Sequence, residues 1–143
     1  MNQKINYLCE ELHFNTSGQK LFEITDKINS WIKLQTINRG HLTIFVKHTS
    51  ASLIIQENVS IDVLEDIQNF FNKLVPENID LYQHSIEGKD DMPAHIKTLL
   101  TQTSLTVPIS NRKMDLGTWQ GIFIYEHRIY PKKRKINLSF IGE

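Results

Sequence analysis

The sequence predicts an α+β fold with a largely antiparallel, β-sandwich-like core and two to three helices. Three observations lead to this prediction. Strand-like alternation is more frequent than helical periodicity, the strand-like segments lie too close together for βαβ crossovers, and neither a repeat nor a low-complexity linker interrupts the 143 residues. We therefore expect one domain over residues 1–143, which is long enough to bury a core.

The first half of the chain is expected to alternate between strands and helices. Strands are predicted over residues 5–14, 42–47 and 51–56, and amphipathic helices over 22–32 and 61–74. Ser60 is suited to cap the second helix, and Pro76 ends it. We expect the apolar side of this helix to be buried, with Ile61, Leu64, Ile67, Phe71 and Leu74 facing the core.

The second half begins with a long polar stretch, Glu77–Asp91, which has little periodicity. A loop of this length inside a compact domain is usually functional or disordered. Asp91 is expected to cap a short third helix that has Pro93 in its first turn and ends near Leu100. Three further strands are predicted near residues 104–109, 121–128 and 135–141.

Composition excludes several classes of partner. Sixteen basic residues balance sixteen acidic ones, so the net charge does not attract nucleic acid or an anionic membrane. The basic run at 132–135 is interpreted as a solvated turn. The single cysteine, Cys9, cannot form an intramolecular disulfide, and the chain shows neither a signal-peptide pattern nor an apolar run of membrane-spanning length. We expect a cytoplasmic protein without nucleic-acid or membrane partners.

Polar residues concentrate in three segments where an ordinary core would not place them. These are His48–Ser52 followed by Glu57 and Asn58, then His84–His95, and then Gly117–Gly121 continuing to Glu126–Arg128. Convergence of so many titratable groups is typical of a functional site. The sequence therefore predicts a polar site rich in histidine and acidic residues.

The second segment carries the clearest chemistry. Asp91 and His95 are four residues apart, so a helix brings both side chains to one face, and His84 and Glu87 precede a glycine that lets the loop fold back. A carboxylate and an imidazole placed in this way can share a divalent cation, or the carboxylate can fix the imidazole tautomer. Imidazoles with carboxylates suit zinc, manganese or iron, whereas magnesium prefers carboxylates. The alternative is a simple helix cap beside surface histidines, because the spacing matches no standard zinc motif.

The first segment has two interpretations. His48 continues the inward face of the predicted strand, either as a site residue or as a hydrogen-bonded strand end. Ser50 and Ser52 lack a Gly-x-Ser-x-Gly elbow, which argues against a hydrolase triad. Thr49, Ser50 and the Gly117–Gly121 backbone suit phosphate or carboxylate oxygens, while Trp119 is interpreted as core or interface packing.

The third segment ends in a strand pattern that separates neighbouring side chains. Glu126 and Arg128 should point to one face and His127 to the other. Only one of these sets can enter a given cavity, unless a bulge intervenes or a neighbouring subunit meets the other face.

At these residues the sequence resembles the YjbQ family, also called the secondary thiamine-phosphate synthase family. The matching stretches span nearly the whole chain: His48–Leu53 with Glu57 and Asn58, Glu87–Lys97, Leu116–Ile122, Glu126–Arg128 and Ile141–Glu143. The resemblance implies a homotrimer with a polar cavity near the subunit contacts. It also implies a weak thiamine-phosphate synthase activity, which joins a pyrimidine diphosphate to a thiazole phosphate and releases pyrophosphate, beside an unsettled physiological role.

The resemblance also implies roles for individual residues. A divalent metal ion, zinc or magnesium, is expected on His48, His84, His95 and His127. Catalytic roles are expected for Asp91, Glu87, His95 and Arg128, and phosphate binding for Thr49, Ser50, Asn58 and Arg128. His13 and His41 match no family motif and are left out of the site.

Two departures from the family pattern affect turns. Arg112 stands where the family usually has glycine, which suggests a positive φ that arginine tolerates poorly. We interpret it as a surface turn, with an added phosphate donor as the alternative. Pro131-Lys132-Lys133 replaces small residues before the final strand.

Two functions are therefore weighed. The first is a metal-dependent enzyme acting on a small phosphorylated metabolite, and the second is a non-catalytic homotrimer that binds a metal or an anion. Convergent titratable groups favour the enzyme. Spacing alone identifies neither a nucleophile nor a base.

Overall fold

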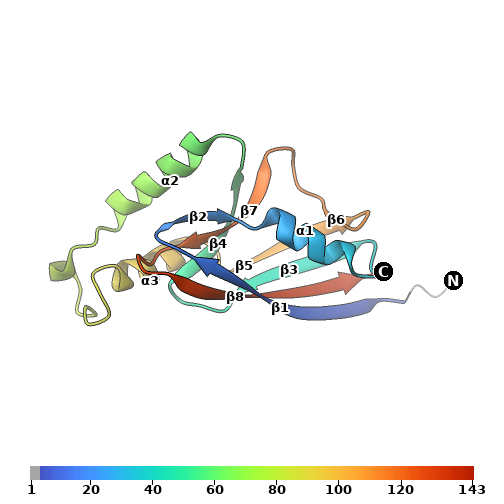
Figure 1. The fold of residues 1–143 in the computed structure, drawn as a ribbon, viewed down its shortest axis with the longest axis horizontal. Coiled ribbons are helices and arrows are strands. Elements are labelled where there is room, and N and C mark those ends of the chain that lie inside the picture. Colours follow the sequence, from blue (N-terminus) through green and yellow to red (C-terminus); the bar gives the residue numbers. More distant parts are fainter. Residues whose placement is uncertain (1–3) are drawn as a thin grey trace.

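The computed structural model describes residues 4–143, so residues 1–3 of the predicted domain lie outside the described residues. Two strand pairs, each followed by helical segments, lead to the last helix, and four strands complete the chain (Figure 1). The strands are β1 Asn6–Thr16, β2 Lys20–Glu23, β3 Gly40–Val46, β4 Ala51–Glu57, β5 Ser104–Ser110, β6 Lys113–Met114, β7 Gln120–Glu126 and β8 Lys132–Gly142. The helices are α1 Thr25–Lys33, α2 Ile61–Leu74, the 3₁₀ turn η1 Ile79–Leu81 and α3 Asp91–Leu100.

The strands form two antiparallel sheets, which confirms the predicted fold class. One sheet has the order β1-β8-β3-β5-β6 and the other has the order β2-β7-β4. Inward-facing residues of both sheets and the inner side of α1 make one apolar core. Alternation explains the arrangement, since every second residue of β8 from Arg134 to Phe140 is buried. Each fully buried aliphatic side chain contributes about 1.5–3 kcal/mol to stability.

Several element boundaries differ from the prediction. Phe22 lies in β2, which pairs with β7 opposite Ile124, and α1 begins only at Thr25. The sheet edge satisfies the backbone of residues 20–23 and overrides their helical spacing. Lys132 and Lys133, predicted as a solvated turn, begin β8 and pair with β1. The structure also contains the two-residue strand β6, which is too short to give a recognisable periodicity in the sequence.

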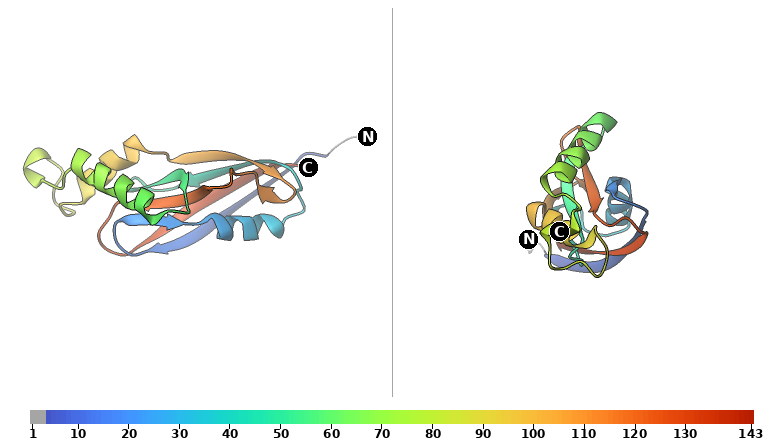
Figure 2. Two further views of the ribbon diagram at one scale, coloured as in Figure 1. Left: turned by 90° about the horizontal axis from the view of Figure 1, so that it is seen from above. Right: turned by 90° about the vertical axis from the view of Figure 1, so that its left-hand side faces the viewer.

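The predicted burial of the α2 face is wrong for the single chain. None of the residues of α2 is buried by residues 4–143, and the side chains of Ile61 and Leu74 are 68% and 54% exposed. Figures 1 and 2 show α2 reaching away from the sheets. Phe71 makes an edge-to-face contact with Tyr125 of β7, with ring centroids 5.8 Å apart. Leu64, Ile67 and Phe71 are half-buried within residues 4–143, so this chain covers the apolar stripe of α2 only in part.

The turn between β5 and β6 bears out the positive φ expected at Arg112. Asn111 and Arg112 have φ of 51° and 57°, the combination that two-residue hairpin turns require. The guanidinium of Arg112 donates to the carbonyls of Lys33 and Gln35 at the C-terminus of α1. These bonds satisfy helix-end acceptors and offset the backbone strain. Arg112 is thus part of a surface turn, and its guanidinium binds carbonyl groups at the end of α1.

Candidate functional site

The site is built where the loop after η1 enters α3. Asp90 occupies the N-cap position of α3, and Asp91, which was predicted to be the cap, is the first residue of the helix. Gly88 has a φ of +115°, a conformation that favours glycine, and the Asp91 amide donates to its carbonyl. This turn folds the loop back toward the helix, so that His84 reaches the first turn of α3.

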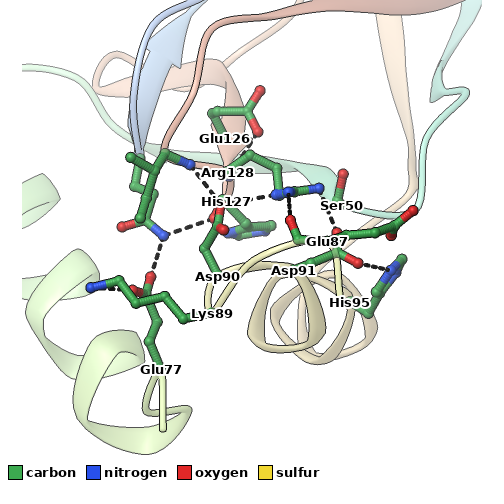
Figure 3. A network of polar contacts seen from close by, with 12 residues as sticks. Ser50, Glu77, Glu87, Lys89, Asp90, Asp91, His95, Glu126, His127 and Arg128 are labelled. Carbon is green, nitrogen blue, oxygen red and sulfur yellow. Dashed lines mark hydrogen bonds and ion pairs between the residues drawn. The ribbon is translucent and has the colours of Figure 1, made fainter. Parts of the chain in front are cut away.

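Three side chains converge at this point. The Nε2 atom of His84 lies 2.6 Å from Oδ2 of Asp91, and Nε2 of His95 lies 3.3 Å from the same oxygen. One ligand atom from each residue lies within 4.8 Å of the other two. Figure 3 shows His95 and Asp91 together on one side of α3, as the four-residue spacing predicted. Glu87 lies at the edge of this group, with Oε2 3.3 Å from Nε2 of His84.

The tautomer of His95 follows from its other ring nitrogen. Nδ1 lies 3.0 Å from the carbonyl oxygen of Thr49, which can only accept, so Nδ1 carries the proton and donates it. In the neutral ring, Nε2 therefore presents a lone pair toward the Asp91 carboxylate. This lone pair and the Asp91 oxygen could both bind one metal ion placed between them. A carbonyl behind a metal-ligating imidazole is a common supporting arrangement.

Arg128 holds the acidic residues from the opposite side. Its Nε donates to Asp90 at 2.9 Å, its Nη1 donates to Oδ1 of Asp91, and its Nη2 donates to the Glu87 carbonyl at 2.9 Å. Figure 3 shows this guanidinium between the start of α3 and the end of β7. Asp91 thus gives one oxygen to Arg128 and the other to the histidines. In this arrangement Arg128 positions Asp91, and all three of its nitrogen atoms already have partners.

The charges of the group reinforce one another. Burial of Asp91 opposes its ionisation, yet the hydrogen bond from His84 and the charge of Arg128 outweigh burial and hold its carboxyl pKa below the ordinary value. The same hydrogen bond with Asp91 raises the pKa of His84. At neutral pH the group therefore keeps an ionised carboxylate as its centre.

His48 lies near this group without joining it. Its Nε2 accepts the backbone N–H of Lys135 at 2.8 Å, so Nδ1 carries the proton in the neutral ring and neither nitrogen offers a free lone pair. Burial, followed by the charge of Arg134, lowers the pKa of His48. With Thr49 and His95 it lines a cavity of about 430 Å³, here named the α3 pocket, whose other walls are Thr98, Leu99, Thr101 and Thr103.

His127 is buried elsewhere, directly after the end of β7. Its Nε2 lies 2.9 Å from the hydroxyl oxygen of Ser52, and its ring packs 4.3 Å from that of Tyr125. Burial, and then the charges of Lys97 and Arg134, lower its pKa to about 3. The structure therefore places His127 as a neutral interior residue apart from His84 and His95.

The three residues at the end of β7 diverge, so only Arg128 reaches the candidate group. Glu126 is fully buried, where it accepts hydrogen bonds from Arg134 and Thr16. The expectation that Glu126–Arg128 cannot all face one cavity agrees with this geometry, but the expectation that Glu126 and Arg128 point to the same face is wrong. Glu126 and Arg128 separate because the strand ends between them.

The predicted phosphate ligands do not gather in one place. Thr49 lies beside His95, while the hydroxyl and carbonyl of Ser50 accept from Nη2 of Arg134. Asn58 lies at the opposite end of β7. Its side-chain Nδ2 donates to Glu23, and its backbone N–H donates to the Trp119 carbonyl. The Gly117–Gly121 segment shares that end with a separate cavity of about 440 Å³. Trp119 is 65% exposed, so it is not part of the core of the single chain.

Two important residues were not named as site residues from the sequence. Asp90 binds Arg128 and accepts from the Ile129 amide, and only its position beside Asp91 hinted at this. Arg134 was interpreted as part of a basic turn, but it lies on the inward face of β8 and holds Glu126. Because Arg134 is two residues before Ile136, the alternation of β8 places both side chains on the inward face, and this pattern could have identified Arg134.

The fold and this site define the class of protein: an α+β protein of two antiparallel sheets, with a candidate metal group at the start of α3. Comparison with known proteins then identifies the family. Residues 10–143 match the family model described as UPF0047 protein YjbQ-like. The chain belongs to this family, as its motifs suggested.

Relatives and solved structures agree with this assignment. A UPF0047 protein of Synechocystis is 48% identical over 94% of this chain and 91% of its own length. The UPF0047 protein YjbQ of Escherichia coli is 42% identical over 84% of this chain and 87% of its own length. The crystal structure of an uncharacterised YjbQ/UPF0047 protein from Clostridium acetobutylicum has a TM-score of 0.82 and 33% identity, covering 92% of this chain and 98% of that one.

A more distant structure shows the same fold. A YbjQ-like protein of unknown function from Sulfolobus solfataricus has a TM-score of 0.88 at 22% identity, covering 98% of this chain and all of that one. None of the helices within residues 4–143 has the length and hydropathy needed to cross a membrane.

Proposed function

We propose that His84, Asp91 and His95 bind one divalent metal ion, and that this site acts on a small phosphorylated metabolite in the cytoplasm. One observation carries the proposal. A single oxygen of Asp91 lies within 3.3 Å of both Nε2 atoms, and Thr49 fixes the His95 tautomer that leaves Nε2 able to bind a metal.

The donor set favours zinc over magnesium. Two imidazole nitrogens and one carboxylate suit zinc or another transition metal, and three protein ligands leave a position open for a substrate or water. Magnesium would depend on Asp91 and Glu87 with bound waters. In the metal-free protein His84 donates a hydrogen bond from Nε2 to Asp91, and a metal ion would take the place of this hydrogen. Because protons compete with the metal for the imidazole nitrogens, metal binding should weaken as the pH falls.

The residues around the group support chemistry on a phosphate. A divalent ion bound there neutralises charge on phosphate oxygens or on a departing diphosphate. Arg128 holds Asp91 in place, and the exposed carboxylate of Glu87 beside His84 is suited to accept a proton. The transfer that we propose as a secondary activity is thiamine-phosphate synthesis, in which thiazole phosphate displaces pyrophosphate from a pyrimidine diphosphate.

A second candidate function is metal or anion binding without turnover. It is favoured by the state of Arg128, because three of its five N–H groups already bind Asp90, Asp91 and the Glu87 carbonyl and its charge is paired with two carboxylates. An enzyme would need the two remaining N–H groups of Arg128, or another donor, to bind the substrate phosphate. Turnover with the two thiamine precursors separates the two functions.

We also propose that the protein works as a homotrimer whose subunits cover the α2 stripe. Within residues 4–143 the apolar stripe of α2 stays largely uncovered, because Leu64, Ile67 and Phe71 are only half-buried and Ile61 and Leu74 are exposed. An uncovered stripe of this kind is typical of a subunit contact. In sedimentation experiments we expect a trimer for the unchanged protein and for Asn69→Asp on the exposed side, and dissociation for Phe71→Asp. A monomeric unchanged protein would contradict this proposal.

Zinc titration with a chromophoric competitor tests the metal site. We expect one zinc ion per chain, a loss of affinity of about 100-fold in His95→Ala, and unchanged affinity in His41→Ala, whose imidazole is exposed near the start of β3 and does not belong to the group. Equal affinities in the two variants would overturn the proposed ligand set. For activity, product formation with zinc or magnesium should disappear in Asp91→Asn, and turnover that survives this change would exclude this site.

A further inference from the structure

The α3 pocket adjoins the proposed metal group directly. His95 belongs to both, and the Thr49 residue whose carbonyl fixes His95 also lines the pocket. Its volume of about 430 Å³ lies in the range of small-molecule sites. A ligand bound to the metal at Nε2 of His95 would therefore find a cavity of suitable size beside it.

One wall of this pocket carries a polar group without a partner. The side chain of Thr98 is 94% buried, as its residue is only 6% exposed, and its hydroxyl makes no hydrogen bond within residues 4–143. Thr98 follows His95 by three residues, so both side chains lie on one face of α3. A buried hydroxyl left unpaired is unfavourable, which makes it a natural partner for a ligand atom.

His48, which also lines the pocket, could supply a second donor. Because Nε2 of this ring accepts from the Lys135 amide, the neutral ring carries its proton on Nδ1. None of the residues that line the pocket is acidic, lysine or arginine, and Leu99 adds an apolar side. Donors on uncharged walls recognise an uncharged group that carries hydrogen-bond acceptors.

We propose that the α3 pocket binds the uncharged organic part of the substrate, a compact ring or amide with acceptor atoms, while its phosphate lies at the metal. This inference rests on the proposed function and narrows its substrate class to phosphate esters of small uncharged groups. The cavity at the far end of β7 is lined by the charged residues Asp26, Lys113 and Asp115 and contains none of the unpartnered buried atoms found in the described residues. It does not compete for this role.

Nuclear magnetic resonance of the zinc-free protein tests the pocket with nicotinamide, an uncharged ring with acceptors, and with nicotinate, its charged counterpart. We expect nicotinamide to shift the signals of Thr98 and the Leu99 methyl groups with a roughly millimolar Kd, as suits a fragment. Nicotinate should bind there at least about fivefold more weakly, because its carboxylate enters an uncharged pocket. Equal binding of both probes, or shifts only at the far cavity, would overturn the proposal.

Variants separate the pocket from the metal site. Thr98→Val removes the unpaired hydroxyl at nearly constant volume, so the protein should fold normally and bind nicotinamide about fivefold more weakly. Thr118→Val, at the far cavity, should leave binding unchanged, as should zinc affinity in Thr98→Val. Unchanged nicotinamide affinity in Thr98→Val overturns the pocket alone. Failure of the unchanged protein to bind zinc overturns the proposed function, whereas pocket shifts from nicotinamide would still support the pocket.

Discussion

The neutral, buried imidazole of His127 should make the protein sensitive to acid. Its pKa is about 3 in the folded protein and 6.5 ordinarily, so between these values only the unfolded chain takes up the proton. Stability is therefore complete above pH 6.5 and falls as the pH decreases toward 3. Linkage over these two pKa values gives a loss of about 2 kcal/mol in the free energy of unfolding between pH 7 and pH 5.

Urea unfolding at pH 7 and pH 5 measures this loss against His127→Gln. Glutamine keeps a hydrogen-bonding group for Ser52 and does not titrate, so other acid-sensitive groups cancel in the comparison. Protein concentration is held equal because subunit association also affects stability. We expect the unchanged protein to lose about 2 kcal/mol more than the variant. An equal loss of stability in both proteins would refute the burial of a neutral His127. A lower zinc affinity in His127→Gln than in the unchanged protein would instead indicate that His127 is a metal ligand.

Three arginine substitutions give further expected outcomes. Arg128→Met should lower the free energy of unfolding by about 2–4 kcal/mol in urea and raise the pKa of Asp91, measured by carboxyl NMR, because the carboxylate loses its guanidinium. Arg134→Met should destabilise by about 3–5 kcal/mol, since it leaves Glu126 buried without a countercharge. Thermal unfolding should show that Arg112→Ala is about 1 kcal/mol less stable than Arg112→Gly. Both variants lose the hydrogen bonds to α1, and only glycine accepts the positive φ easily. Equal stability of the two would show that the turn changes its conformation.

Sequence patterns predicted the site best where spacing is local. The interval between Asp91 and His95 requires only one helical turn, and the structure brings both to one face. Gly88 indicated that the loop could fold back, and His84 does reach Asp91. These features depend on helix geometry and on one turn, both of which are visible in a single sequence.

Features that depend on distant pairing could not be predicted in the same way. Alternation showed that the residues at the end of β7 diverge, but not that Arg128 meets Asp90 or that His127 meets Ser52. Phe22 fitted a helical pattern and became a strand only because β7 lies beside it. The apolar periodicity of α2 was read correctly as a face that needs cover, but a sequence does not show whether that cover is the same chain or another.

We propose that His84, Asp91 and His95 form a metal site. Crystals soaked with zinc and measured at the zinc absorption edge test it most directly. We expect one anomalous peak per chain, from an ion bonded to Nε2 of both histidines and to Oδ2 of Asp91. The absence of a peak there, or a peak at His127 or His48 instead, would contradict it.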